Sequence, residues 1–315
     1  MDIELLQERA RIIKSIRNFF DSFGYLECDT PLLSPNLIPE SCLEVFETSR
    51  LVPTLHGQPW KESLWLVPSP EIWMKKLLAD HHISLYQICH CFRNVESIGK
   101  IHNPEFSMLE YYTIDAMYKD SLILTEELLR IFPAVPEFRK PLLRLTMAEA
   151  FFNYAGIDLF TAFETGSLEE HARNLDLNPP AHCSPAELYD LIFVHAVEPR
   201  LPIDQPVALM DYPAFVPCLA QKSPDGRTTE RWELYIRGVE LANCYSEERD
   251  PDAVRLFFET EAAKKSRSAL VQHAVDQNYW QIFRNFPRCS GVALGLDRLI
   301  MIVTGRHSID SILPF

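Results

Sequence analysis

The feature that most constrains the fold is a pair of alternating apolar stretches joined by a long polar loop. Residues 84–92 and residues 106–113 alternate with the two-residue period of a β-strand, and residues 93–104 between them are polar. Side chains on one face of a strand recur at every second position. The pattern therefore predicts an antiparallel hairpin with a long loop.

The second strand of this hairpin presents an unusual face. Phe106, Met108, Glu110 and Tyr112 share it, so an aromatic ring, a carboxylate and a phenol point the same way. Such a face suits a pocket for a flat base and a cationic amine, although a surface hairpin with solvated charges fits equally well. The loop adds cationic groups of the kind that bind phosphates. These are Arg93, Lys100 and His102.

A second predicted hairpin carries two acidic side chains. If Arg237-Gly238 forms a two-residue turn, Glu233 faces Ala242, and Glu240 lies diagonally across from Glu233 on the same face. Diagonal neighbours of this kind are roughly 7–8 Å apart, and one or two carboxylates together with nucleotide phosphates are the usual ligands of Mg²⁺. The hairpin therefore indicates a magnesium site, with two solvated glutamates as the alternative.

A third segment joins a strand of small residues, 291–296, to a helix predicted over residues 297–303. Glycine lets a ligand approach the backbone closely, and Arg298 adds positive charge at a helix start, where phosphate is already favoured. The segment lacks the Gly-x-Gly-x-x-Gly pattern and the strand–helix–strand context of a dinucleotide site. An ordinary strand-to-helix corner is the alternative.

The remaining pattern interleaves helices with hairpin strands, which predicts an α+β fold with an antiparallel sheet flanked by helices. Residues 5–23 have helical periodicity, and Gly24 is expected to end that helix. A further helix is expected to begin with Ser69 as its N-cap and Pro70 at its first position. The other expected elements are short strands at 25–30 and 64–67, helices over 118–200, strands over 206–247 and helix over 252–285.

Composition excludes several classes of protein. No apolar run reaches the roughly 20 residues of a membrane span, and the first residues lack the features of a signal peptide. The net charge of −14 disfavours binding of nucleic acid through its phosphates. The eight cysteines are scattered, as in a cytosolic protein with reduced thiols. Cys89-His90-Cys91 has no second ligand pair, so we expect no zinc site.

In this order and spacing, the segments resemble the three motifs of class II aminoacyl-tRNA synthetases. Residues 26–31 resemble motif 1, whose proline belongs to a dimer interface, residues 92–106 resemble motif 2, and residues 291–298 resemble motif 3. The resemblance covers essentially the whole chain. It implies a single class II catalytic domain over residues 1–315 that forms a homodimer. A finer resemblance to the lysine branch rests on His102-Asn103-Pro104-Glu105-Phe106, on the Glu110-x-Tyr112 pair and on Glu240-Leu241-Ala242-Asn243.

Lysyl-tRNA synthetases carry an N-terminal anticodon-binding barrel, whereas here the helix before the motif 1 segment begins at residue 5. We therefore expect no anticodon-binding domain. A shortened lysine-type core resembles the branch of the family that attaches lysine or (R)-β-lysine to a lysine side chain of elongation factor P. Ala293, at a position where lysyl-tRNA synthetases have glycine, agrees with this branch. The implied acceptor is elongation factor P, and the resemblance argues against a tRNA.

The resemblance also implies roles for matching residues. Glu71, with Ser69 and Pro70 before it, would bind the α- or β-amino group of the substrate, and Arg93 and Arg298 would be the catalytic residues. The residues implied to bind the rest of the amino acid are Glu110, Tyr112, Asn243, Glu247 and Ala293. Those implied to bind ATP are Arg93, Asn94, Glu96, His102, Asn103, Phe106, Glu240, Leu241, Gly295 and Arg298, with Glu233 and Glu240 holding Mg²⁺.

The implied reaction has two steps. The substrate carboxylate attacks the α-phosphate of ATP to give an acyl-adenylate and pyrophosphate, and an acceptor amine then displaces AMP. Positioning and charge stabilisation at the α-phosphate would carry the catalysis. No protein nucleophile is needed.

Some positions depart from the family pattern and keep alternatives open. Val95 stands where motif 2 has glutamate, with Glu96 following it, and Cys244 replaces a glycine. The altered loop favours a non-catalytic amino-acid sensor as one alternative, and a free-standing enzyme that charges a tRNA is another. An asparagine synthetase of the synthetase-like type is disfavoured, because an aspartate side chain needs a cation where Glu110 and Glu247 offer carboxylates.

Overall fold

The structure is a computed structural model that describes residues 3–55, 57–95 and 99–313. The chain forms two compact units. The first comprises Met1–Asp115 and Glu248–Phe315, and the second comprises Ala116–Glu247. Each unit is described by itself below.

The strands of the first unit lie in the order β1 (Leu26–Glu27), β5 (Leu85–Phe92), β6 (Glu105–Ile114) and β11 (Cys289–Gly295). β5 and β6 form the predicted long-looped antiparallel hairpin, with Gln87 opposite Glu110. β11 pairs antiparallel with β6 on its other side and places Ala293 opposite Glu110. β1 pairs parallel with β5, so the sheet is mixed at its edge.

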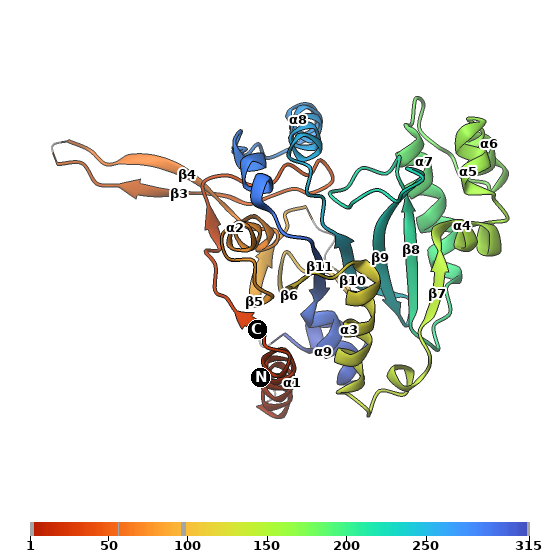
Figure 1. Cartoon of the computed structure of the whole chain (residues 1–315), viewed down its shortest axis with the longest axis horizontal. Coiled ribbons are helices and arrows are strands. Elements are labelled where there is room, and N and C mark those ends of the chain that lie inside the picture. The colour runs from red at the N-terminus through yellow and green to blue at the C-terminus, as the bar shows by residue number, and fades with distance from the viewer. Residues whose placement is uncertain (1–2, 56, 96–98, 314–315) are drawn as a thin grey trace. The chain divides into compact units, whose positions relative to one another are not determined.

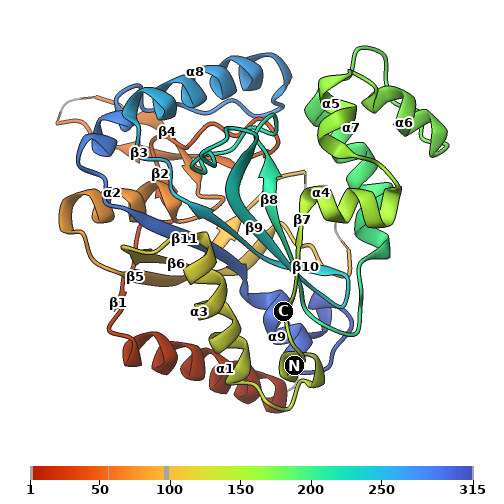
Figure 2. The same ribbon diagram turned by 45° about the vertical axis from the view of Figure 1, so that its right-hand side comes forward.

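Helices cover this sheet. Figures 1 and 2 show α1 (Ile3–Ser22) and α8 (Pro251–Ser268) on opposite sides of the strands β5, β6 and β11. α1 turns its apolar face inward, and Phe20 stacks on Tyr86 of β5 with ring centroids 4.8 Å apart. Two further helices carry candidate site residues. They are α2 (Glu71–His81) and α9 (Leu296–Val303).

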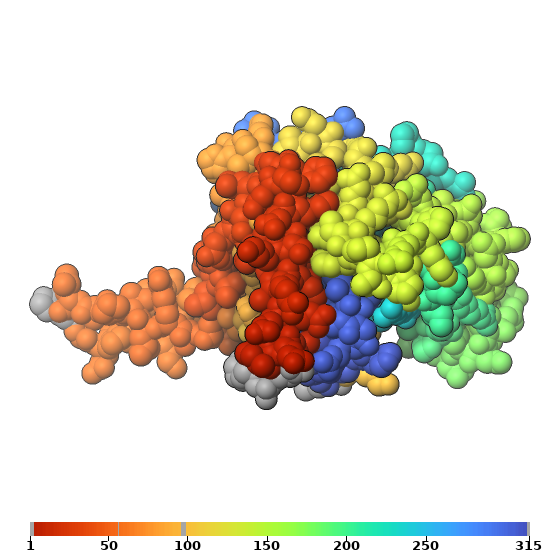
Figure 3. Space-filling model, turned by 90° about the horizontal axis from the view of Figure 1, so that it is seen from below, coloured from red at the N-terminus to blue at the C-terminus, as the bar shows by residue number. Residues whose placement is uncertain are grey.

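A small antiparallel sheet in the first unit has the order β2 (Leu33–Ser34), β4 (Trp60–Leu66) and β3 (Glu47–Val52). β3 and β4 form a long hairpin that projects from the rest of this unit (Figure 3). Its outer part carries large exposed apolar side chains, and Leu55 is 97% exposed. An apolar surface of this kind is typical of a contact region.

In the second unit the strands lie in the order β10 (Val239–Ser246), β9 (Thr228–Ile236), β8 (Val207–Pro213) and β7 (Leu143–Thr146). β10, β9 and β8 are antiparallel to one another, and β7 pairs parallel with β8. Short helices gather beside β7 and β8 (Figure 2) and share an apolar core with them. The helices of this unit are α3 (Tyr118–Arg130), α4 (Met147–Ala150), α5 (Leu159–Glu164), α6 (Leu168–Asn174) and α7 (Pro185–Ile192).

The α+β prediction with a largely antiparallel sheet is confirmed, and several local expectations are wrong. The strand expected over residues 25–30 is only Leu26–Glu27. The helix expected over residues 252–285 ends at Ser268, and a separate short helix follows at Tyr279–Asn285. α2 begins at Glu71 with Pro70 at its N-cap position, and no side chain caps it. The sequence pattern also missed β3, because its residues are mostly exposed and lack alternation.

The sequence argued against a membrane span and against a zinc site at the cysteines. No helix in the described ranges has the length and apolar character required to cross a membrane. The eight cysteines are free thiols. Cys89 and Cys91 lie on one face of β5 with their Sγ atoms 3.8 Å apart, and they pack in a small apolar cluster with Met108. In the described part of the chain, no group of three or more His, Cys, Asp or Glu side chains is arranged to hold a metal ion.

Candidate active site

The centre of the candidate site in the first unit is Glu110 on β6. Its side chain is buried, and Oε1 accepts a hydrogen bond of 2.7 Å from the Tyr112 hydroxyl. Its other oxygen, Oε2, is buried without a hydrogen-bond partner. Burial, and after it the negative charge of Glu71, raises the pKa of Glu110 well above its ordinary value. A buried carboxyl group with one unused oxygen is suited to receive a cationic amine.

Glu71 lies at the first position of α2. Its Oε1 accepts from the Nζ atom of Lys75 at 2.6 Å, one helical turn later, and the Lys75 side chain is fully buried. The electrostatic effect of Glu71 on Glu110 places the two carboxyl groups in one neighbourhood. Lys75 therefore neutralises part of the negative charge that Glu71 brings to the site.

Arg93 follows β5 and lies over the ring of Phe106 on β6, with 5.3 Å between the guanidinium carbon and the ring centroid. The Arg93 amide donates to the Pro104 carbonyl at 2.9 Å, which closes the base of the long loop. The Nε atom of Arg93 is buried and has no hydrogen-bond partner. The pair therefore presents a cation and an aromatic face together, as expected for a site that takes phosphate and a flat base.

Arg298 lies in the first turn of α9. One of its terminal nitrogens is 2.9 Å from Nε2 of His102, and its Nε donates to the Ile101 carbonyl at 3.2 Å. A Cβ atom at Gly295 would come within 3.3 Å of Cδ of Arg298, so glycine leaves room for the aliphatic part of that side chain. The structure thus brings together Arg298, His102 and Gly295 of the predicted nucleotide site. Asn103 is near them in sequence and donates to the Glu105 carbonyl at 2.6 Å.

Asn94 has a different environment from the one expected of a nucleotide-binding side chain. Its Nδ2 donates to the Val45 carbonyl at 3.3 Å, and its Oδ1 accepts from the Val95 amide at 2.9 Å. Val95 has a positive φ of 60°, which is uncommon for a β-branched residue. The side chain of Asn94 therefore fastens two segments of the protein. Glu96, the other expected residue of this stretch, lies outside the described residues.

The second unit contains the predicted acidic hairpin. Arg237-Gly238 is the expected two-residue turn, and both residues have positive φ. A bulge between Glu240 and Ala242 shifts the register, so Glu233 faces Asn243 and the expected pairing with Ala242 is wrong. Glu240 is opposite Tyr235. Because directly opposed residues point to one side of a sheet, Glu240 and Glu233 still share a face.

Glu233 is already bonded to protein donors. Its two oxygens accept from Arg231 at 2.5 Å and from the Tyr235 hydroxyl at 2.7 Å. Burial, then the charges of Glu233 and Glu240, raise the pKa of Tyr235. The two carboxylates therefore flank one hydroxyl group. A carboxylate has about four acceptor positions, so the oxygens of Glu233 keep lone pairs that fit a magnesium ion.

The other predicted residues of the second unit are also held in place. Asn243 accepts from Nε of Arg231 and donates to the Tyr245 hydroxyl, both at 3.2 Å. Leu241 is buried. Glu247 is buried, and its main-chain carbonyl accepts from Gln221 at 2.7 Å. These contacts fix the backbone from which the side chains project.

Sequence reasoning missed some residues that shape the site. Asp297 accepts from the Ser107 amide at 2.6 Å and from Arg9 at 2.7 Å, and thereby joins α9, β6 and α1. Arg231 lies over the rings of Tyr212 and Tyr245. Asp297 lies within the motif 3 segment and Arg231 is two residues before Glu233, but the sequence patterns assigned no role to either. Glu40 is near Glu71 and Arg93, and nothing in its sequence context indicated that.

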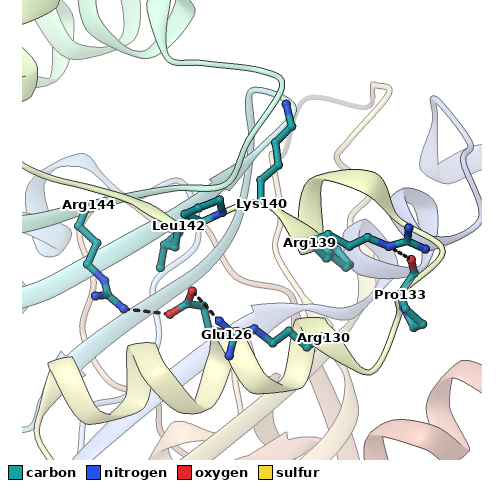
Figure 4. Close-up of a pocket in the computed structure, with 9 residues that line it drawn as sticks. Glu126, Arg130, Pro133, Arg139, Lys140, Leu142 and Arg144 are labelled. Carbon is teal, nitrogen blue, oxygen red and sulfur yellow. Dashed lines mark hydrogen bonds and ion pairs between the residues drawn. The ribbon is translucent and has the colours of Figure 1, made fainter.

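A separate hollow lies in the second unit and contains none of the predicted site residues (Figure 4). Arg130 and Arg144 both point to Glu126, with separations of 3.3 and 2.9 Å. Arg139 donates to the Pro133 carbonyl. These cations are thus satisfied within the protein, in surroundings open to solvent.

Comparison with known proteins shows the family of this chain. The family model described as tRNA synthetases class II (D, K and N) matches residues 3–315. An elongation factor P–(R)-beta-lysine ligase of Avibacterium paragallinarum is 37% identical over 315 residues, which cover 99% of this chain and 95% of that protein. The protein of the same name from Pasteurella multocida (strain Pm70) is 36% identical with the same coverage. The chain therefore belongs to the class II tRNA synthetase family of the D, K and N type.

Proposed function

We propose that this protein is an ATP-dependent ligase that activates lysine or (R)-β-lysine as an adenylate and transfers it to a lysine side chain of elongation factor P. Two relatives that match over nearly their whole length carry the name of this ligase. Within the structure, the supporting observation is the buried Glu110 carboxyl, whose Oε2 has no hydrogen-bond partner. A site that leaves a carboxyl group in this state favours a substrate with a cationic amine.

In the first step, a carboxylate oxygen of the amino acid forms a bond to the α-phosphorus of ATP, and pyrophosphate leaves. Arg93 would hold the substrate carboxylate and the α-phosphate, and its buried Nε–H is available for this. Arg298, supported by His102, would stabilise phosphate charge. In the second step, the acceptor amine attacks the activated carbonyl carbon, loses a proton and releases AMP.

Further residue roles are part of the same proposal. Phe106 would stack on the adenine ring, and Tyr112 would orient Glu110 through the 2.7 Å hydrogen bond. Glu247 would take part in binding the distal amine. Glu233 and Glu240 would hold Mg²⁺, which when bound would neutralise charge on the phosphates of ATP.

We also propose that both units act as one catalytic domain and that the protein is a homodimer. The family match extends over both units. Residues 23–33, which include the motif 1 segment, and the β3–β4 hairpin expose apolar side chains, which a second copy could cover. They are Phe23, Leu26, Leu32, Leu33, Leu51, Leu55 and Trp60. Because the proposed acceptor is a translation factor, the enzyme would work in the cytoplasm.

The test is amino-acid-dependent exchange between ATP and pyrophosphate with α-lysine, (R)-β-lysine and aspartate. Exchange with a lysine isomer and none with aspartate is expected. The preferred isomer, followed by transfer to purified elongation factor P or to tRNA, separates the protein-modifying enzyme from a tRNA-charging one. Folded protein that supports no exchange with Mg²⁺ present would contradict the proposal and favour a sensor of amino acids.

A variant sharpens this test. Glu247→Gln should weaken use of the lysine isomers while the KM for ATP stays the same, because the substitution removes a charge and keeps the side-chain shape. An unchanged preference among amino acids would remove Glu247 from the amine site. Glu164→Gln is a matched control, since Glu164 is an exposed residue of the second unit paired with Arg227.

A further inference from the structure

A loop outside the residues assigned so far is fastened to α8. The buried Lys265 donates from Nζ to the Glu40 carbonyl at 3.0 Å and to the Leu43 carbonyl. One helical turn earlier, Oε2 of Glu261 accepts from the Ser41 amide at 3.0 Å and from the Ser41 hydroxyl at 2.6 Å. Both ends of this short loop are therefore held by charged side chains of one helix.

The same loop is tied to the segment that follows Arg93. The Glu44 carbonyl accepts from the Asn94 amide at 2.9 Å, and the Val45 carbonyl accepts from the Asn94 side chain. The Glu44 carboxylate accepts from the amides of Leu270 and Val271 at 2.9 and 3.0 Å. Asn94, the residue after Arg93, therefore fixes the backbone of the loop relative to Arg93.

These contacts fix the backbone that carries Glu40, and its carboxyl lies within electrostatic reach of charged groups of the candidate site. Glu71, Arg93, Lys265 and Lys75 all act on it electrostatically. Burial, and next the charge of Glu71, raise the pKa of Glu40 to about 7, while the three cations oppose the rise. Burial of an acidic group in such a place lowers the stability of the free protein. Groups with perturbed pKa values of this kind cluster at functional sites.

The charge balance shows what such a ligand must bring. Glu71 and Lys75 form an ion pair of 2.6 Å, whose net charge is zero. Lys265 carries a further positive charge, but its ammonium group is fixed on main-chain carbonyls and holds the loop. Glu40 and Arg93 remain as neighbouring groups of opposite sign. An amino acid has the complementary pattern, an ammonium group close to a carboxylate.

We propose that Glu40 is a further substrate-binding residue, which receives the ammonium group nearest the substrate carboxylate while Arg93 receives that carboxylate. Lys265 and Glu261 are positioning residues for the loop that carries it. The inference rests on the proposed function and adds a residue that binds the amine nearest the carboxylate of its diamino acid substrate. Glu40 and Glu71 meet the amine near the carboxylate, and Glu110 meets the distal amine.

One compound tests the contribution of the amine nearest the carboxylate separately from that of the distal amine. 6-Aminohexanoic acid is lysine without its α-amino group, and equally β-lysine without its β-amino group, so one compound serves for both isomers. The experiment measures binding of the preferred lysine isomer and of 6-aminohexanoic acid by calorimetry, and ATP–pyrophosphate exchange with each. The proteins compared are the wild type, Glu40→Gln, Glu40→Asp and the control Glu62→Gln, an acidic residue of the β4 strand paired with Arg50.

Glu40→Gln is expected to weaken lysine binding by about tenfold or more, the effect of losing one charge-assisted hydrogen bond. Binding of 6-aminohexanoic acid and the KM for ATP should stay within about twofold of wild type, where a damaged fold would change every value. Glu40→Asp should restore part of the lysine affinity. Glu62→Gln should behave as the wild type.

Equal losses for lysine and 6-aminohexanoic acid, or no loss for either, would overturn the assignment of Glu40 and leave the ligase proposal standing. Wild-type protein that binds lysine without supporting exchange would refute the ligase activity, and the calorimetry would still decide the role of Glu40. Wild-type protein that neither binds nor exchanges a lysine isomer would overturn both.

Discussion

Replacing Glu110 by glutamine is expected to make the free protein more stable and its amino-acid site weaker. Glutamine keeps the shape of the side chain and can still accept the hydrogen bond from Tyr112. It removes a carboxyl group that is only 3% exposed and whose Oε2 has no hydrogen-bond partner. Glutamine puts an amide group in place of Oε2, so the gain comes from removing a buried charge. One unit of pKa shift corresponds to about 1.4 kcal/mol, so we expect a gain of about 1 kcal/mol.

The pH dependence of this gain follows from the raised pKa of Glu110. The folded protein keeps the Glu110 proton at pH values where the unfolded chain has already released it. The free energy of unfolding therefore falls as the pH rises between the ordinary carboxyl pKa and the raised one. Glutamine does not titrate, so the stabilisation should be larger at pH 8 than at pH 5. At an unfolding entropy of about 2.1 cal/mol/K per residue, a gain of 1 kcal/mol raises the Tm of a 315-residue chain that unfolds cooperatively by about 1.5 °C.

The loss of activity in Glu110→Gln should come only from the lost contact with the distal amine of the substrate. A hydrogen bond to a charged group contributes about 1.5–3 kcal/mol, which corresponds to a loss of about 10- to 150-fold in kcat/KM for lysine. Norleucine, which lacks the distal amine, should be used equally poorly by both proteins. ATP–pyrophosphate exchange measures these values, and thermal unfolding at the two pH values measures stability.

Glu169→Gln is the control, since Glu169 is half-exposed and pairs with Arg173. It should change neither stability nor exchange beyond error. A Glu110→Gln protein that is less stable than wild type at pH 8 would refute the reasoning about burial. A lysine kcat/KM equal to that of wild type would refute the assignment of Glu110 to the amine.

Three further changes test other parts of the structure. Phe106→Ala should raise the KM for ATP by about tenfold or more, because stacking of a base on an aromatic ring contributes about 1–3 kcal/mol, and an unchanged value would exclude the stacking role. Glu240→Gln should raise the Mg²⁺ concentration for half-maximal exchange by about tenfold or more, whereas an equal requirement would remove Glu240 from the metal site. Trp232→Phe should lower the free energy of unfolding by about 1–3 kcal/mol in urea titrations, because the buried Trp232 Nε1–H donates to the Tyr118 carbonyl at 2.6 Å; stability equal to wild type would contradict this.

Local patterns predicted the elements that carry most residues of the candidate site. The alternation in residues 84–92 and 106–113 indicated the β5–β6 hairpin, and it put Glu110 and Tyr112 on one face. The small residues before Arg298 indicated the corner between β11 and α9. These predictions succeed because the period of a strand or helix is set within a few residues of the chain.

Tertiary structure decided the register of the acidic hairpin and the partners of the charged groups. The bulge at Glu240 and Ala242 moved Glu233 opposite Asn243, although a regular two-residue turn precedes it. A bulge adds one residue to one strand, and alternation before and after it looks regular in sequence.

Contacts between distant parts of the chain could not be predicted from the sequence for a different reason. Arg9 reaches Asp297 across 288 positions, and Glu261 reaches Ser41 across 220. The sequence alone determined which side chains bear charge and on which face of a local element they lie. Only the folded chain decided which charges meet, because ion pairs and loop anchors depend on the packing of helices and strands from opposite ends of the sequence.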